Sequence, residues 1–236
     1  MAINQCLKIG KIDTSAYNLF TTDAGVFATF ARSYNMISIP GRSGDLEIDN
    51  NKFENGTLTF PAVITEDFMS NMIAFKSAIN RQVGYQKIVD PFMPGYFRMG
   101  IYTNDGAPKM SADQTTGSFT MKFNCKPQLF LNEGDVPKIF TANGTLKNPT
   151  GYRTRPLIRL YGTGTLGIGD YSIVVNTAGT DYIDFDCETM DAYEGSQNRN
   201  GNVTVAHEPF LNEGTTGITL TGLTKAEIKA RWFTIL

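Results

Sequence analysis

The sequence predicts a mainly β protein with one helix, arranged as an N-terminal β domain that carries the helix and a C-terminal β-sandwich. Three observations support this class. Several short segments alternate apolar and polar residues, as strands with one buried face do. Turn-forming residues separate these segments, and the 236-residue chain contains 23 glycines. Only one stretch spaces its apolar residues as a helix does.

Two strands stand out in the N-terminal half. The first buries every second residue between 58 and 64, and its Pro61 lacks an N–H, which favours an edge strand or a bulge. The second alternates strictly over residues 118–126. The residues expected to point inward are Leu58, Phe60, Ala62, Ile64, Phe119, Met121, Phe123 and Cys125.

The single helix is expected at about residues 66–82. Its apolar stripe is Phe68, Met72, Phe75 and Ile79, and Met69 and Ile73 add to or flank that stripe. Thr65 is the expected N-cap, with Glu66 and Asp67 in the first turn, where the helix dipole favours negative charge. Arg81 lies near the end, and Gly84 follows as a stop.

The second half repeats the strand pattern. Gly169-Asp170 predicts a two-residue turn between strands at 166–168 and 171–175. Segments 183–188 and 218–221 also alternate. Residues 225–232 are rich in helix formers, yet Ala226, Ile228, Ala230 and Trp232 alternate with four charged residues, so a strand is predicted.

Turn residues between 132 and 151 predict a boundary between a domain at 1–131 and a domain at 132–236. The chain has 21 Lys+Arg and 23 Asp+Glu, a net charge of −2. This balance argues against nucleic-acid binding as the main task. No segment reaches the length of a membrane span, and no signal peptide is recognised, so synthesis in a cytoplasm is expected.

The candidates for chemistry are few. Three scattered cysteines and a single histidine, His207, argue against a disulfide framework, a zinc site and most histidine-dependent mechanisms. A carboxylate cluster could serve a glycosidase or bind calcium. A solvated strand face flanked by turn aspartates is the favoured interpretation, because alternation alone predicts it. The cluster consists of Asp181, Asp184, Asp186, Glu188 and Asp191.

Three further segments have structural explanations as well as functional ones. The loop 40–45 contains two glycines and Arg42 but lacks the ending of a phosphate loop, so a turn between strands is expected. His207 has no positioned partner in sequence and is expected on the surface. The aromatic stretch 90–99 fits a protein-contact surface and a core-packing loop equally well.

The order of several weak motifs resembles the distal tail protein (Dit) family of siphophages, in the short form without an inserted carbohydrate-binding module. The resemblance spans nearly the whole chain. Its segments are Ile39–Asn50, Phe53–Asn55, Gly84–Asp90, Tyr96–Arg98, Phe119–Gln128, Asn148–Pro149, Pro156–Gly162, Ile183–Asp186 and Arg231–Trp232.

This resemblance implies a split β-barrel-like N-terminal domain with one helix and a galectin-like C-terminal β-sandwich. It implies a structural protein of the virion tail tip, assembled in the bacterial host, without enzymatic activity or cofactor. The N-terminal domains would form a hexameric ring that joins the tail tube protein to the tail-associated lysin or tip protein. Tape measure and receptor-binding proteins are further possible partners, and DNA would pass through the lumen only in transit.

Two other functions remain open from the residues alone. A carbohydrate-binding module would need exposed aromatic rings, and the C-terminal half offers five tyrosines and Trp232, although Trp232 falls on the apolar face. A glycoside hydrolase would use Asp184 and Asp186. A structural hub ranks first, the carbohydrate module second and the hydrolase third.

Overall fold

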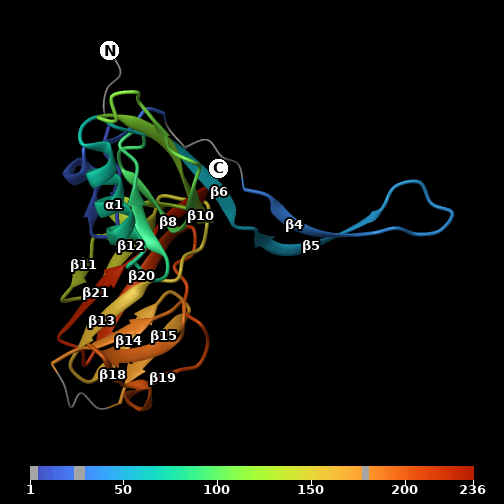
Figure 1. Cartoon of the computed structure of the whole chain (residues 1–236). Helices are drawn as coiled ribbons and strands as arrows, with labels where there is room; N and C mark the ends of the chain where they lie inside the picture. Colours follow the sequence, from blue (N-terminus) through green and yellow to red (C-terminus); the bar gives the residue numbers. More distant parts are fainter. Residues whose placement is uncertain (1–4, 24–29, 177–180) are drawn as a thin grey trace. The chain divides into compact units, whose positions relative to one another are not determined.

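The computed structural model describes residues 5–23, 30–176 and 181–236, except for the side chains of residues 104 and 105. The described chain is mainly β and divides into two compact units (Figure 1). Unit 1 comprises Met1–Leu129 and Ile235–Leu236, and unit 2 comprises Phe130–Thr234. No helix of the described residues is long and apolar enough to cross a membrane.

Unit 1 is built on a curled antiparallel sheet with the strand order β2-β1-β7-β8-β10-β6-β3, and β9 pairs with β10. The longest strand, β10, pairs with β6 from Gly117↔Ile64 to Cys125↔Gly56. The strands are β1 (Lys8–Ile9), β2 (Ile12–Asp13), β3 (Leu19–Thr21), β6 (Gly56–Ile64), β7 (Gln86–Val89), β8 (Tyr96–Asp105), β9 (Lys109–Met110) and β10 (Gly117–Leu131); a 3₁₀ turn covers Thr14–Tyr17.

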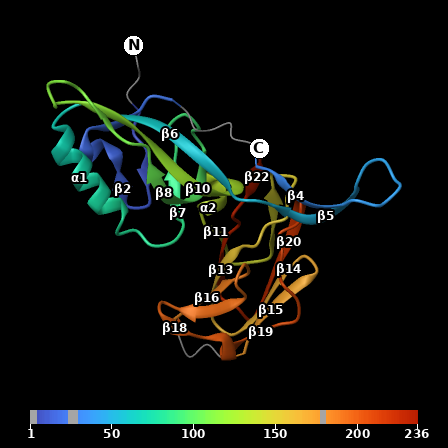
Figure 2. The same ribbon diagram turned by 45° about the vertical axis from the view of Figure 1, so that its right-hand side comes forward.

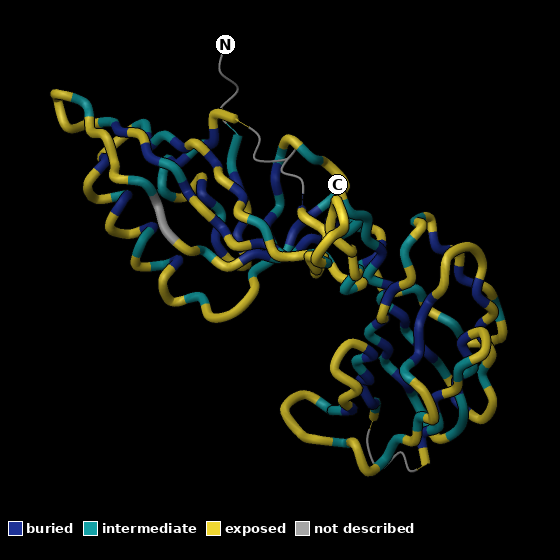
Figure 3. Tube along the Cα trace, turned by 90° about the vertical axis from the view of Figure 1, so that its right-hand side faces the viewer, coloured by how far each residue is buried: buried dark blue, intermediate teal, exposed yellow. Residues whose placement is uncertain are grey.

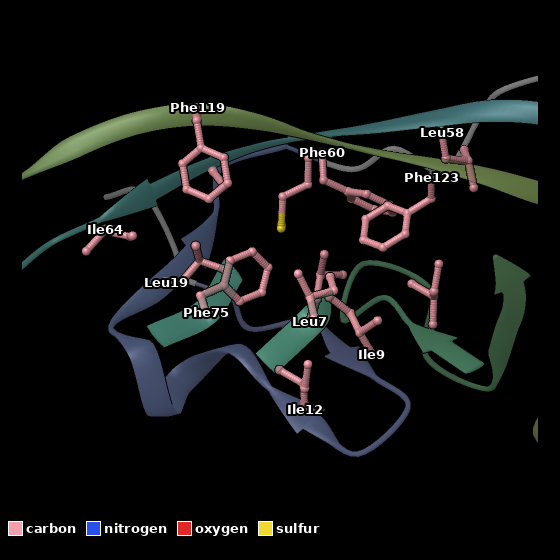
Figure 4. Close-up of a cluster of buried hydrophobic side chains, with 14 of the residues drawn as sticks. Leu7, Ile9, Ile12, Leu19, Leu58, Phe60, Ile64, Phe75, Phe119 and Phe123 are labelled. Atoms are coloured by element: carbon pink, nitrogen blue, oxygen red, sulfur yellow. The ribbon is translucent and has the colours of Figure 1, made fainter. Parts of the chain in front are cut away.

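The inward residues of β6 and β10 form the core of unit 1, as their alternation predicts. In Figure 4, Phe60, Phe119 and Phe123 point from these strands toward Leu7, Ile9, Leu19 and Phe75. Phe123 contacts Phe60 and Tyr102 edge to face, with ring centroids 5.8 and 5.5 Å apart. The pairing of β3 with β6 ends at Thr21↔Ala62, and Pro61 is the next residue of β6 beyond that end.

The helix α1 (Phe68–Ile79) buries the predicted stripe of Phe68, Met72, Phe75 and Ile79. Its ends differ from the expectation of 66–82. The N-cap is Asp67 rather than Thr65, and Asp67 takes a left-handed conformation without a side-chain cap hydrogen bond. The Thr65 backbone N–H instead donates to Asn18. Thus the first turn carries no acidic residue, since Glu66 and Asp67 precede it.

Strands β4 (Arg32–Ile37) and β5 (Leu46–Phe53) pair only with each other and form a separate two-stranded ribbon, which we call the arm. The arm stands apart from the curled sheet in Figures 1 and 2. None of residues 31–57 is buried, in contrast to the dark blue interior of the sheet in Figure 3. The arm therefore contributes nothing to the core of unit 1.

Unit 2 packs two antiparallel sheets face to face in a galectin-like β-sandwich. One sheet has the order β11-β21-β13-β16-β17-β18 and the other β12-β20-β14-β15-β19. The strands are β11 (Lys138–Phe140), β12 (Gly144–Asn148), β13 (Leu157–Tyr161), β14 (Gly164–Ile168), β15 (Tyr171–Val175), β16 (Ile183–Asp186), β17 (Asp191–Glu194), β18 (Gln197–Asn198), β19 (Val203–Val205), β20 (Gly214–Thr221) and β21 (Lys225–Lys229). The last strand of the chain, β22 (Phe233–Ile235), belongs to neither of these sheets and pairs with β10.

The predicted strands of unit 2 are confirmed. The turn at Gly169-Asp170 joins β14 to β15, with Ile168 opposite Tyr171. Residues 225–232 combine helix-forming residues with the alternation of a strand, and the strand is what forms. β21 covers Lys225–Lys229, and the whole apolar row from Ala226 to Trp232 is buried. A short helix, α2 (Asn132–Asp135), occupies the predicted turn cluster.

The two ends of unit 2 lie beside each other. The Leu131 backbone N–H donates to the Trp232 carbonyl at 2.8 Å. The rings of Phe130 and Phe233 meet edge to face with centroids 6.0 Å apart. The chain therefore enters unit 2 and leaves it through neighbouring segments.

Replacing Phe123 with alanine should lower the free energy of unfolding by about 3–5 kcal/mol, because a fully buried ring leaves a cavity that its neighbours cannot close. Urea unfolding followed by circular dichroism measures this change. Ser118→Ala, an exposed position on the same strand, should stay within about 0.5 kcal/mol of the wild type. Equal stability of the two variants would contradict this account of the core.

Candidate functional site

The carboxylates singled out in the sequence are paired with arginines in unit 2. Asp184 on β16 accepts two hydrogen bonds from Arg159, at 2.7 and 2.9 Å. Asp186 accepts two from Arg231, at 2.7 and 2.8 Å. The expectation of a solvated strand face is wrong for Asp184, which is 7% exposed. Arg159 lies opposite it on β13 and covers it.

The pair with Arg231 holds the Asp186 carboxylate in its charged form. Burial alone would raise the pKa of Asp186, but hydrogen bonds from Arg231 and from the Glu188 backbone outweigh burial and lower that pKa. Burial would likewise lower the pKa of Arg231, whereas its hydrogen bonds to Asp186 raise it. A glycosidase needs one carboxyl that is protonated near neutral pH, and Asp186 is shifted in the opposite direction.

The remaining members of the cluster do not converge on a common centre. Glu188 lies 3.6 Å from Arg231, and Asp191 accepts a hydrogen bond from Asn200 at 3.4 Å. Asp181 is exposed. Among the residues that the structure describes, no group of three histidine, cysteine or carboxylate side chains could hold a metal ion.

His207 lies in an exposed bend after β19, as predicted for a surface histidine. The adjacent Glu208 forms an ion pair with Arg155. The loop 40–45 belongs to the connection between β4 and β5, where Gly41 and Gly44 adopt left-handed conformations, and no helix follows it. This confirms a turn between strands.

The aromatic stretch 90–99 is divided between core and surface. Phe97 and Arg98 are buried, whereas Phe92 is 38% exposed. The Arg98 guanidinium lies 4.9 Å from the Phe30 ring centroid. Burial raises the pKa of Asp90, whose backbone and side chain support the turn before β8. The stretch therefore serves mainly to pack the start of β8.

The tyrosines of unit 2 do not form an open stacking surface. All five are half-buried, and Trp232 is 1% exposed. Lys225 lies 3.9 Å from the centroid of Tyr161, and Arg159 lies 4.0 Å from that of Tyr182. A cation thus already occupies one face of each of these two rings.

The arm is the feature that stands out as a candidate interaction site. Both of its faces carry large apolar side chains in contact with solvent. Tyr34 and Met36 lie on one face and are 45% and 60% exposed. Ile37, Leu46 and Ile48 lie on the other and are 43–45% exposed.

The sequence contained a signal for this site that the strand analysis did not use. Residues 34–37 and 46–48 place apolar side chains on both faces of a ribbon, where a half-buried strand would place them on one. Residues 46–48 lie in a segment that carries the family resemblance, whereas residues 34–37 lie in none. Neighbouring polar groups stabilise the base of the arm, where Arg32 bonds to Asp49.

Comparison with solved structures shows the fold that the resemblance implies. The chain is similar to the SPP1 Dit protein, described as a paradigm of the hub adsorption apparatus in phages that infect Gram-positive bacteria. That match has a TM-score of 0.65 and 13% identity, and covers 94% of this chain and 97% of that one.

A second likeness is to chains of the phage p2 baseplate in its activated conformation, solved with Ca and with Sr. Both matches have a TM-score of 0.59 and 11% identity, and each covers 94% of this chain and 96% of the other. No family model and no curated protein sequence matches the chain. At these identities the likeness establishes a shared fold.

Replacing Asp186 with asparagine should destabilise unit 2 by about 2 kcal/mol at pH 7. Removing one partner of a fully buried pair costs about 3–5 kcal/mol, and the Arg231 side chain is 26% exposed, so the loss is smaller. Since the folded protein lowers the pKa of Asp186, the stabilisation is present above the unfolded pKa of about 3.9. It is lost as the pH falls through the folded pKa.

The difference between wild type and Asp186→Asn should therefore shrink as the pH drops below about 4. Fluorescence of the single tryptophan, which lies in the core of unit 2, reports this transition. Asp191→Asn, at an exposed position on the neighbouring strand, is the matched control. A pH-independent difference would contradict the assigned ion pair.

Proposed function

We propose that the protein is a structural hub of a bacteriophage tail tip, and that copies of it form a closed ring. The resemblance of the sequence and the shared fold of Dit and baseplate chains support a ring of six. In this proposal unit 1 forms the ring. The ring joins the tail tube protein to the tail-associated lysin or tip protein, and DNA crosses its lumen.

The observation that carries the proposal is the uncovered arm. A two-stranded ribbon with both faces in water is marginally stable at best. Large exposed apolar patches mark protein interaction surfaces. Here five large apolar side chains of one ribbon are each more than 40% exposed. A second copy of the chain is the simplest partner that supplies the missing cover, since each copy then provides an arm and a surface that receives one.

The absence of a candidate centre for catalysis among the described residues fits this role. The paired carboxylates Asp184 and Asp186 are committed to arginines, and His207 is exposed without a positioned partner. Burial raises the pKa of the Cys125 thiol to about 12 and also raises that of Cys187, which disfavours the reactive thiolate at these two positions. A non-enzymatic component of the virion is consistent with these features.

Outward-facing unit 2 would be available for receptor-binding proteins, and the tape measure protein is a further possible partner inside the tube. Direct saccharide binding remains an alternative that no feature of the tyrosines in unit 2 favours. The location that follows from the proposal is the virion tail tip, after assembly in the host cytoplasm.

Replacing Tyr34 and Met36 together with serine should convert rings into monomers. About half of each side chain is exposed in a single copy, at 45% and 60%, so covering it is worth about 0.7–1.8 kcal/mol at each contact. Light scattering coupled to size-exclusion chromatography and native mass spectrometry measure the change. Asn35→Ser, a polar position on the opposite face of the same strand, should leave the rings intact.

Wild-type protein that stays monomeric at every concentration would overturn the ring. A ring that persists in the double variant would show that this face of the arm is not its contact.

A further inference from the structure

One face of the arm carries a row of acidic residues on β5 beside a row of apolar residues on β4, and we call it the acidic face. Glu47 and Asp49 lie on β5 on the same face as Met36 and Tyr34 on β4, because these residues are direct partners across the ribbon. Asp45 precedes β5 at the same alternation. Asp49 bonds to Arg32, whereas Asp45 and Glu47 have no ion-pair or hydrogen-bond partner among the described residues.

The outer face of the curled sheet shows the complementary arrangement. On β10 the outward positions carry Lys122 and Lys126, about 13 Å apart along the strand. Lys109 on β9 lies beside Ser118 at the same face. Lys109 and Lys122 are exposed and have no side-chain partner among the described residues. The neighbouring strand β8 presents Met99 and the 37% exposed Ile101.

The other outward side chains of β6 and β10 on this face are uncharged. Thr57, Thr59 and Thr120 are its outward residues on β6 and β10, together with Pro61. The outward positions of 57–63, 97–103 and 118–128 include no carboxylate. A groove of about 270 Å³ hollows the face beside Lys109 and is lined by Pro61, Val63, Ser118 and Thr120. A ribbon can therefore approach the sheet closely there.

We propose that the acidic face of one copy's arm lies on this lysine-bearing outer face of the sheet in the next copy. The acidic row of β5 meets the lysine row of β10, and the apolar row of β4 meets Met99 and Ile101 on β8. This inference rests on the proposed ring and names the surface that receives the arm. The two surfaces differ, so the contact is head to tail, which is the geometry that closes rings.

The charges decide between this surface and the other exposed apolar surface of unit 1. The outward residues Met69 and Ile73 of α1 are 54% and 63% exposed. Glu66 and Asp67 precede that helix and would repel an acidic ribbon. The outer face of the sheet offers lysines instead, and complementary charge fixes the register of a contact.

Two charge-reversed proteins test the proposal. The arm variant carries Asp45→Lys and Glu47→Lys, and the sheet variant carries Lys109→Glu and Lys122→Glu. Each alone should need at least a tenfold higher concentration to form rings. Mixed in equal amounts, they should form rings again, because each arm then finds a sheet of opposite charge. Native mass spectrometry should show equal numbers of both proteins in every ring.

A control with the same change in net charge as the sheet variant is Lys11→Glu with Lys147→Glu, both exposed positions outside the proposed contact. It should form rings as the wild type does. Circular dichroism and Trp232 fluorescence establish that each variant is folded.

The outcomes of these experiments distinguish failure of this inference from failure of the proposed function. Monomeric wild type would remove the ring itself. Wild-type rings that survive in the sheet variant would overturn the inference and leave the ring intact. Loss of rings in Ile73→Lys, with no effect of the sheet variant, would place the arm on α1. Mixed rings of unequal composition would show that the reversed charges do not face each other.

Discussion

Strict alternation along β10 is the constraint on which unit 1 depends. Phe119, Met121 and Phe123 must point inward to close the core against α1 and the N-terminal strands. A slip of one residue would exchange them for Lys122 and its neighbours. The same requirement therefore fixes both surfaces of the strand. Its apolar side holds the fold together, and its polar side forms an outer face on which Lys122 has no side-chain partner among the described residues.

The cores and the arm differ in whether their apolar side chains are covered. This difference separates the residues that stabilise the fold from those that are available to a partner. The apolar side chains of the two cores are covered by other residues of the same chain. In unit 2 the carboxylates of β16 are matched as well, with Arg159 on Asp184 and Arg231 on Asp186. The arm differs, because large apolar side chains on both of its faces are exposed. Its apolar residues are therefore available to a partner.

Much of this fold follows from sequence because periodicity reports which side of an element is buried. That is why β6, β10, the β14–β15 hairpin and β21 were predictable. Periodicity does not report which residues meet across the fold. Arg159 and Asp184 are 25 positions apart, and Arg231 and Asp186 are 45 apart, so a solvated face was predicted where ion pairs exist. The start of α1 was missed because its cap depends on the backbone of Asp67, not on a side chain. The arm is not recognisable as a site from the sequence alone. Apolar residues on both faces of a ribbon indicate an interaction surface only once the ribbon is known to stand apart from the sheet.

The neighbouring ends of unit 2 have an evolutionary consequence. A module whose entry and exit are joined by a hydrogen bond between Leu131 and Trp232 behaves as a cassette. Recombination at these two neighbouring ends can exchange, enlarge or shorten unit 2. The strands that carry the arm and the lysines of β10 then keep their order. Unit 2 can then diversify while the core of unit 1 stays unchanged.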